Sequence, residues 1–101
     1  MNKPEASLAI QVLPQSVAGD ELLRIVDNVI AYIKGTGLKT QVGPFETVIE
    51  GDFNKLMDIA KECQLICIRG GAENLLTYMK VAYNPNGGVW SIDEKTAKHT
   101  N

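Results

Sequence analysis

The sequence predicts one α+β domain, residues 1–101, with the element order βαββαβ and a short helix at the end. Two stretches with apolar residues three and four apart, 20–34 and 52–69, each lie between stretches typical of strands. Gly43-Pro44 divides the middle of the chain into two short strands. A length of 101 residues fits a single domain.

The first strand is expected over Ser7–Leu13, where apolar residues alternate, and Pro14 is expected to end it. Asp20 is expected to cap the first helix, because an aspartate side chain accepts hydrogen bonds from free N–H groups in the first turn. That helix ends near Lys34, and Gly35 follows as a stop. Its apolar side consists of Leu22, Val26, Val29, Ile30 and Ile33.

The segment Gly37–Gly51 is predicted to be a hairpin with arms at Lys39–Val42 and Thr47–Glu50. In the second arm, Glu50 shares a sheet face with Val48, opposite Ile49. A carboxylate among apolar strand residues costs free energy unless it is paired, hydrogen-bonded or solvated. Glu50 therefore either protects a sheet edge or serves a site.

The second half of the chain repeats the pattern and adds a tail. Asp52 is expected to cap a second helix, which two glycines end after residue 69. A fourth strand follows at Asn74–Tyr83. Ser91 and Glu94 have the spacing of a capping box, which predicts a short terminal helix over residues 91–98.

This order is the ferredoxin-like pattern, an antiparallel four-stranded sheet with strand order 4-1-3-2. Right-handed crossovers place both long helices on one face of the sheet. The other face is then left uncovered by the monomer, and a half-apolar open face invites a partner. That face is predicted to carry Ala9, Leu13, Val48, Leu76 and Tyr78, mixed with Gln11, Glu50 and Lys80.

Composition and charge favour a soluble cytoplasmic protein. With 45% hydrophobic and 22% charged residues the chain resembles an ordinary globular protein. A net charge of −2 without a basic stripe gives no reason to expect nucleic-acid binding. No segment resembles a signal peptide or a membrane span, and Met1–Glu5 is expected to be a frayed end.

Catalytic and metal chemistry find little support in the sequence. Cys63 and Cys67 lie four residues apart on one predicted helix, which indicates free thiols in a reducing cytosol. His99 is the sole histidine and lies in the tail, so no histidine–carboxylate metal cluster is expected. Phosphate-loop, dinucleotide-loop and nucleophile-elbow motifs are absent. We expect a binding protein with no cofactor rather than an enzyme.

A binding site can be proposed from the predicted sheet. Gln11 and Glu50 lie on adjacent central strands and offer an amide and a carboxylate. Phe45 and Tyr78 can supply flat apolar surface nearby. This set suits a planar heteroaromatic ring with an amino group beside a ring nitrogen. The pocket is expected at the uncovered sheet face or at a subunit boundary, with Glu50 facing it.

The chain resembles the thiamine-binding YkoF-like family over nearly its whole length. The similarity is carried by GLKTQVGPFETVIEGDF (37–53), KLMDIAKE (55–62) and GGVWSIDEKTAKH (87–99). The resemblance implies a ferredoxin-like fold, dimers that pair into tetramers, and binding of thiamine through its hydroxymethylpyrimidine half. It also implies a cytoplasmic role in vitamin B1 transport, buffering or salvage.

Two candidate site residues, Thr47 and Glu50, match the family pattern directly. The bulky Phe45 departs from the small residue common in the family, and it could close the pocket or stack on the ligand. Two other functions remain open: a ligand-free regulatory or assembly module that oligomerises through the open sheet face, and a small enzyme. The remaining candidates come from the predicted geometry alone and are Gln11, Ser16, Phe45 and Tyr78.

Overall fold

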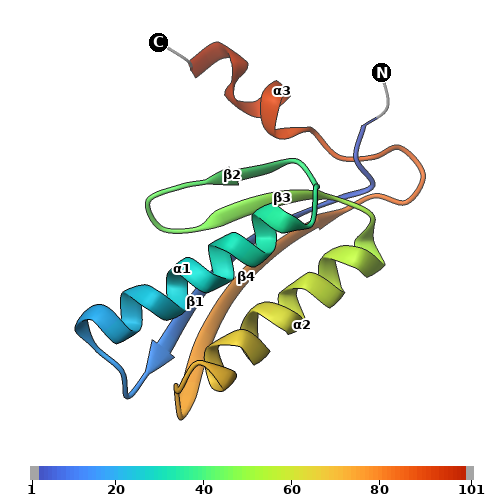
Figure 1. The fold of residues 1–101 in the computed structure, drawn as a ribbon. Coiled ribbons are helices and arrows are strands. Elements are labelled where there is room, and N and C mark those ends of the chain that lie inside the picture. Colours follow the sequence, from blue (N-terminus) through green and yellow to red (C-terminus); the bar gives the residue numbers. More distant parts are fainter. Residues whose placement is uncertain (1–2, 100–101) are drawn as a thin grey trace.

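The computed structural model describes residues 3–99 and has the predicted ferredoxin-like architecture, with sheet order β2-β3-β1-β4. Both long helices cover the same face of the antiparallel sheet, and a short helix lies at one end, as Figure 1 shows. The elements are β1 (Ala6–Gln15), α1 (Gly19–Gly35), β2 (Thr40–Val42), β3 (Thr47–Gly51), α2 (Phe53–Arg69), β4 (Asn74–Tyr83), α3 (Ile92–Thr96) and the 3₁₀ turn η1 (Ala97–His99).

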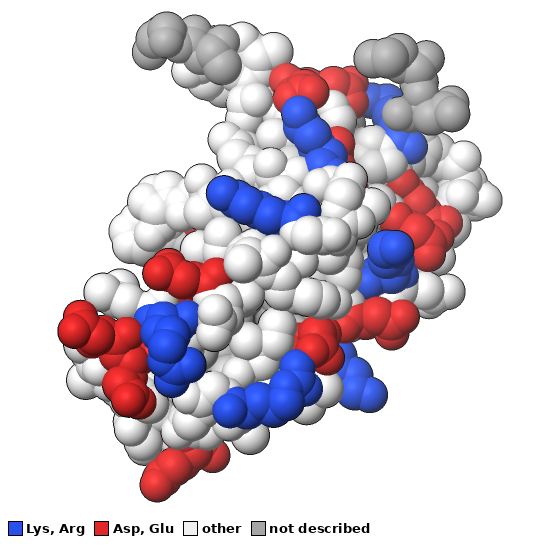
Figure 2. All heavy atoms as spheres, in the orientation of Figure 1, with Lys and Arg blue, Asp and Glu red and all other residues white. Residues whose placement is uncertain are grey.

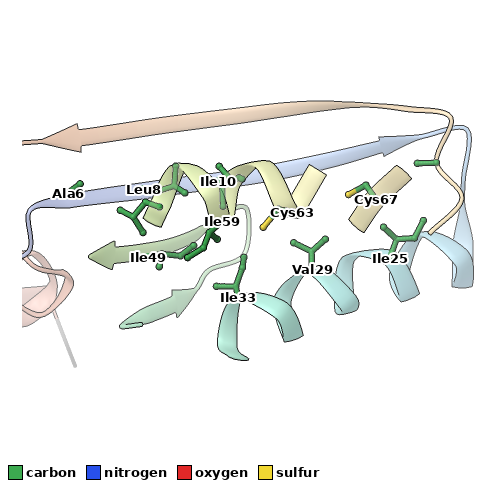
Figure 3. Close-up of a cluster of buried hydrophobic side chains, with 13 residues drawn as sticks. Ala6, Leu8, Ile10, Ile25, Val29, Ile33, Ile49, Ile59, Cys63 and Cys67 are labelled. Atoms are coloured by element: carbon green, nitrogen blue, oxygen red, sulfur yellow. The ribbon is translucent and has the colours of Figure 1, made fainter. Parts of the chain in front are cut away.

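The core lies between the sheet and the two long helices (Figure 3). Alternate residues of β1 and β3, such as Leu8 and Ile49, point into it and are fully buried. Each large apolar side chain buried in this way contributes about 1.5–3 kcal/mol to folding. The helices contribute one row each: Ile25, Val29 and Ile33 from α1, and Leu56, Ile59, Ala60, Cys63 and Cys67 from α2.

Strand β1 is longer than predicted, because Pro14 lies within it and does not end it. The pairing explains the error. β1 pairs with β4 along its whole length, but its pairing with β3 stops at Ile10. Past Ile10 the strand has a free side, and a proline is tolerated where a strand lacks a hydrogen-bonded neighbour.

The helix starts follow the prediction only in part. Asp52 caps α2, since its Oδ2 accepts a hydrogen bond from Lys55 N at 3.4 Å. Asp20 was wrongly assigned as a cap, because α1 begins one residue earlier and its N-cap, Ala18, has no side-chain bond. The predicted apolar side of α1 also missed one fully buried residue, Ile25.

The N-terminal segment is fixed from Lys3 onward, which corrects the expectation of a frayed end; residues 1–2 lie outside the described range. Glu5 Oε1 accepts a hydrogen bond from Phe53 N at 2.8 Å and so assists Asp52 at the start of α2. Pro4 O accepts a hydrogen bond from Val89 N, also at 2.8 Å. These contacts hold the first residues against the segment that leads into the tail.

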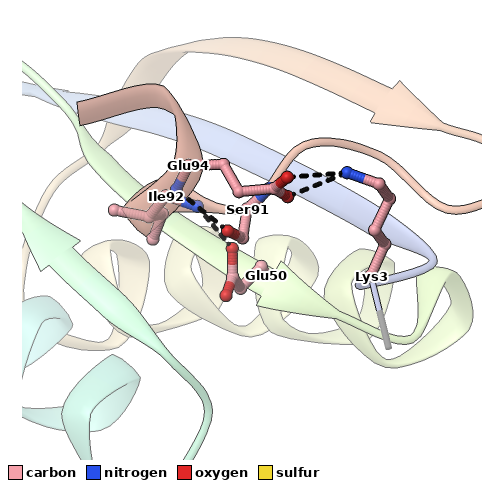
Figure 4. Close-up of polar contacts among 5 residues, drawn as sticks. All are labelled: Lys3, Glu50, Ser91, Ile92 and Glu94. Carbon is pink, nitrogen blue, oxygen red and sulfur yellow. Dashed lines mark hydrogen bonds and ion pairs between the residues drawn. The ribbon is translucent and has the colours of Figure 1, made fainter. Parts of the chain in front are cut away.

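The tail helix α3 has the predicted capping box, in which Ser91 and Glu94 satisfy each other's backbone N–H groups. Glu94 also forms a 2.8 Å ion pair with Lys3, and this partner lowers the pKa of the Glu94 carboxyl (Figure 4). Glu50 Oε2 accepts a hydrogen bond from Ile92 N at 2.8 Å. Because α3 has only five residues, these contacts rather than helix propensity hold it in place.

The surface charges are mixed and the two cysteines are free thiols, in line with the composition. On the face in Figure 2, acidic and basic side chains are interspersed rather than separated into patches. Cys63 and Cys67 are free and buried. Within residues 3–99, no helix is long and apolar enough to span a membrane, and no three histidine, cysteine or acidic residues cluster as metal ligands.

Candidate functional site

The unequal strand lengths leave a hollow beside β1. The hairpin of β2 and β3 ends opposite Ile10, so the part of β1 from Gln11 onward has no neighbour on that side. Helix α1 covers this gap from the helix side of the sheet, and the turn Gly43–Glu46 closes one end of it. The result is a cavity of about 310 Å³, which is at the lower end of the range of about 300–1,000 Å³ typical of small-molecule sites.

We call this cavity the hairpin pocket. Its walls are mainly aliphatic and come from α1, from the middle of β1 and from the β2–β3 turn. Glu46 is its one charged lining residue. The lining consists of Ile10, Gln11, Val12, Val26, Val29, Ile30, Ile33, Val42, Gly43, Pro44, Phe45, Glu46 and Thr47.

Two polar side chains of the hairpin pocket are available to a ligand. Thr47 is only 7% exposed, yet no described residue is hydrogen-bonded to its hydroxyl. The half-buried Gln11 likewise has no side-chain hydrogen bond to any residue in the range 3–99. No fully buried side-chain nitrogen or oxygen atom of a described residue lacks a partner, so both groups are open to the cavity, where a ligand can replace the water that hydrates them. An amide and a hydroxyl together offer donors and acceptors within one pocket.

Two residues of the turn complete the pocket. The Phe45 side chain is 78% exposed, which leaves its ring available to stack on a ligand at the entrance. The Glu46 carboxylate forms an ion pair with Lys80 at 3.4 Å, which ties the turn to β4. Because Lys80 already compensates this carboxylate and no cation lines the pocket, the pocket suits neutral or cationic ligands better than anions.

The structure brings together three of the six residues proposed from sequence: Gln11, Phe45 and Thr47 all line the hairpin pocket. Ser16 lies away from it, at the end of β1, in the left-handed region with φ 64°. Tyr78 is the register partner of Gln11 on β4 and is 60% exposed. With Glu46, it lines a smaller neighbouring cavity of about 230 Å³.

Glu50 lies apart from the hairpin pocket, on the open face of the sheet, as its position in the strand predicted. Its carboxylate is hydrogen-bonded to the first turn of α3 (Figure 4). Glu50 is half-buried and does not face the hairpin pocket, so this pocket does not meet the expectation of a site with Glu50 facing it. Its partner in this structure is a backbone N–H of the tail.

Several lining residues were not proposed from the sequence. Val26 and Ile30 were assigned to the apolar side of α1 but not to a site, although both are only half-buried. The signal was the width of that side, which is broader than the row needed for the core. Glu46 gave no pattern signal, because turn residues are placed by the fold rather than by periodicity.

The fold and the hairpin pocket define a small ferredoxin-like α+β domain with one face of its sheet open. The chain belongs to the family described as thiamine-binding protein, whose pattern it matches over residues 8–100. It is 43% identical over 93 residues to a UPF0045 protein of Clostridium perfringens, covering 92% of this chain and 95% of that one.

Solved structures agree with the fold. A DUF77 domain from Bacillus cereus is 34% identical with a TM-score of 0.86, covering 95% of this chain and 90% of its own. A Thermotoga maritima protein, described as a candidate for thiamine biosynthesis or salvage, is 31% identical with a TM-score of 0.83, covering 96% of this chain and 100% of its own. Family membership and this relative together give the chain a thiamine-related role.

Proposed function

We propose that this protein binds thiamine, or its free hydroxymethylpyrimidine half, in the hairpin pocket, and that it acts without catalysis in vitamin B1 transport, buffering or salvage. One observation carries the proposal. The unpartnered side chains of Gln11 and Thr47 line the same aliphatic cavity at its sheet side. Membership in the thiamine-binding protein family supports this choice of ligand.

The chemistry of an aminopyrimidine suits the pocket. Such a ring presents an amino donor beside a ring-nitrogen acceptor, and the amide of Gln11 offers the complementary pair. The hydroxyl of Thr47 can accept or donate a further bond. The ring faces would lie between the aliphatic side chains of α1 and the exposed ring of Phe45. Glu46 would attract the positive charge of the thiazolium ring.

The test is a calorimetric titration of the full chain with thiamine and with hydroxymethylpyrimidine. We expect both to bind, and Gln11→Leu and Thr47→Val each to weaken binding about tenfold or more, because each leaves a ligand group unpaired. Ser16→Ala is the matched control and should bind normally, since Ser16 lies outside the pocket. The absence of heat and of any thermal shift with either ligand would refute the proposal.

A second function, a regulatory or assembly module that oligomerises through the open sheet face, has its own support. Strand β4 is an outer strand, and its large apolar residues are exposed on both faces. Exposed apolar surface of this kind marks protein interfaces. Under this alternative the chain self-associates and ligands leave its melting temperature unchanged. The exposed residues, 43–60% accessible, are Leu76, Tyr78, Met79, Val81 and Tyr83.

Self-association through the outer strand β4 is compatible with ligand binding, and we propose a cytoplasmic homo-oligomer that binds its ligand within each subunit. Two buried free thiols fit a reducing compartment. Sedimentation of the protein with and without thiamine separates the cases. Association that does not depend on thiamine, together with saturable thiamine binding, is expected if both hold.

A further inference from the structure

A second cavity lies on the other face of the sheet, beneath α3. It has a volume of about 370 Å³ and is separate from the hairpin pocket, with which it shares only Glu46. Its floor is the open face of the sheet, and α3 forms one wall. We call it the tail pocket; its lining is Ser7, Ala9, Gln41, Glu46, Val48, Lys80, Val81, Ala82, Ile92, Lys95 and Thr96.

We propose that the tail pocket is a second ligand site, for a small molecule with a flat apolar body and one negatively charged oxyanion group. The shape follows from the floor, where Ser7, Ala9 and Ala82 lie side by side on neighbouring strands. Their short side chains leave a depression that Val48 and Ile92 border with apolar surface. A planar ring would fit such a depression and replace water over it.

The charge of the tail pocket indicates an anion. Two lysines and one glutamate line it. Lys80 is paired with Glu46 at 3.4 Å. Lys95 has no acidic partner within ion-pair distance among residues 3–99, so its ammonium charge is uncompensated. No lysine lines the hairpin pocket, so of the two cavities only the tail pocket offers positive charge to a ligand.

A hydroxyl on the floor of the tail pocket supports the same conclusion. Ser7 is 6% exposed and lines the tail pocket, and no other described residue is hydrogen-bonded to its side chain. A polar group that is nearly buried and lacks a protein partner is satisfied by water or by a ligand. The hydroxyl of Ser7 and the amide of Gln41 can both donate to an oxyanion.

The pocket is also preformed. Glu50 binds Ile92 N, and Lys39 forms an ion pair with Asp93 at 3.3 Å. Lys3 holds Glu94 at 2.8 Å from the N-terminal segment. The wall therefore exists before a ligand arrives, which lowers the entropy cost of binding. This arrangement gives Glu50 a structural part in the tail pocket although it does not line it.

The test uses benzoate and phenyl phosphate as probes and benzamide as the neutral control. Their binding is measured by NMR shifts of backbone amides and by calorimetry. We expect both anions to shift the amides of Ser7, Ala9 and Ala82, and benzamide to bind at least about tenfold more weakly. The ratio of benzoate to phenyl phosphate affinity identifies which oxyanion the site prefers. Equal affinity for benzamide, or shifts confined to the hairpin pocket, would overturn the proposal.

Variants locate the binding. Lys95→Gln should weaken both anions about five- to tenfold, whereas Lys61→Gln on the exposed side of α2 should leave them unchanged. Ala82→Phe fills the depression and should abolish binding while the melting temperature stays within a few degrees. If neither anion binds the wild type, or if Lys95→Gln instead alters the oligomeric state, the face is an interface between copies and the proposal is wrong.

Discussion

Glu50 shows how the role of one residue depends on its partner. The sequence marks it as an acid in an apolar strand, and the structure gives it the N–H of Ile92 at 2.8 Å. A backbone N–H at a helix start carries partial positive charge, so a carboxylate is a favourable acceptor there. This hydrogen bond offsets the free-energy cost of placing a carboxylate in the strand. It also holds the short helix α3 against the sheet.

Removal of that bond should release α3. We expect Glu50→Ala to destabilise the docked tail by about 1–2 kcal/mol, because it leaves the N–H of Ile92 without its acceptor. Hydrogen exchange at residues 92–96 measures the effect directly. Glu94→Gln, which removes the charge paired with Lys3 at the surface, is the milder control. If Glu50→Ala abolishes thiamine binding while α3 stays protected, Glu50 belongs to the ligand site.

Cys63 is expected to lower the stability of the folded protein as the pH rises above 9. Burial, and then the nearby Cys67 and Glu62, raise the pKa of the Cys63 thiol from 9.0 to about 12. The charged thiolate is therefore disfavoured in the folded state. Below pH 9 the thiol is neutral in both states and the stabilisation is complete; as pH rises toward 12, the unfolded chain loses its proton first and stability falls.

Urea unfolding at pH 8 and pH 10.5 checks this dependence. We expect the wild type to lose about 1–2 kcal/mol more across that interval than Cys63→Ala, since the variant lacks the titrating group. The loss of stability caused by the smaller alanine side chain is the same at both pH values. It therefore cancels when the change in unfolding free energy between pH 8 and pH 10.5 is compared for the two proteins. Equal losses in both proteins would show that the Cys63 thiol does not carry the effect. A thiol reagent should also react slowly with the native protein at pH 8.

At the scale of elements, the pocket exists because a short hairpin faces a long strand. Helix α1 presents one row to the core and a second, half-buried row to the hairpin pocket. We expect Ile30→Phe to fill the pocket and reduce thiamine affinity more than tenfold, with the free energy of unfolding changed by less than about 1.5 kcal/mol. Calorimetry and urea unfolding measure the two quantities.

The matched control lies on the same helix. Leu23 is 61% exposed and does not line the hairpin pocket, so Leu23→Phe should bind thiamine like the wild type. Thiamine affinity retained by Ile30→Phe, or lost equally in both variants, would argue against the hairpin pocket as the site.

The order of the elements was predictable, because each periodic stretch and each turn signal is local. Where the sequence misled, a neighbour decided the outcome. Pro14 stays inside β1 because β3 has already ended beside it. The start of α2 uses Glu5, a residue 48 positions from its partner Phe53, and no local pattern can reveal such a contact.

Part of the geometry of the candidate site follows from local pattern. Strand parity puts Gln11 and Thr47 on opposite faces of the sheet, and the shortness of the hairpin lets both line one cavity. Parity could not show that Glu50 would meet the tail, since that depends on how the chain returns after β4. Ser16 was proposed from the predicted geometry alone, and in the structure it does not line the cavity.

At the scale of the whole molecule, the sheet is covered unevenly. The inner strands β1 and β3 supply core residues, whereas β4 keeps large apolar side chains exposed on both faces and forms an outer edge. A long apolar edge strand readily pairs with another chain. We therefore expect the protein to self-associate through β4, and the hairpin pocket, formed beside β1 by α1 and the β2–β3 turn, to remain open in the assembly.

Charged substitutions on β4 test both statements. Leu76→Lys and Met79→Lys alter residues 54% and 43% exposed, on opposite faces of the strand, so each should disrupt association while it leaves the core intact. Leu23→Lys, on α1, is the control and should sediment like the wild type. Because neither β4 residue lines the hairpin pocket, the dissociated variants should keep thiamine affinity within about threefold. Affinity lost in step with dissociation would mean instead that a second subunit completes the pocket.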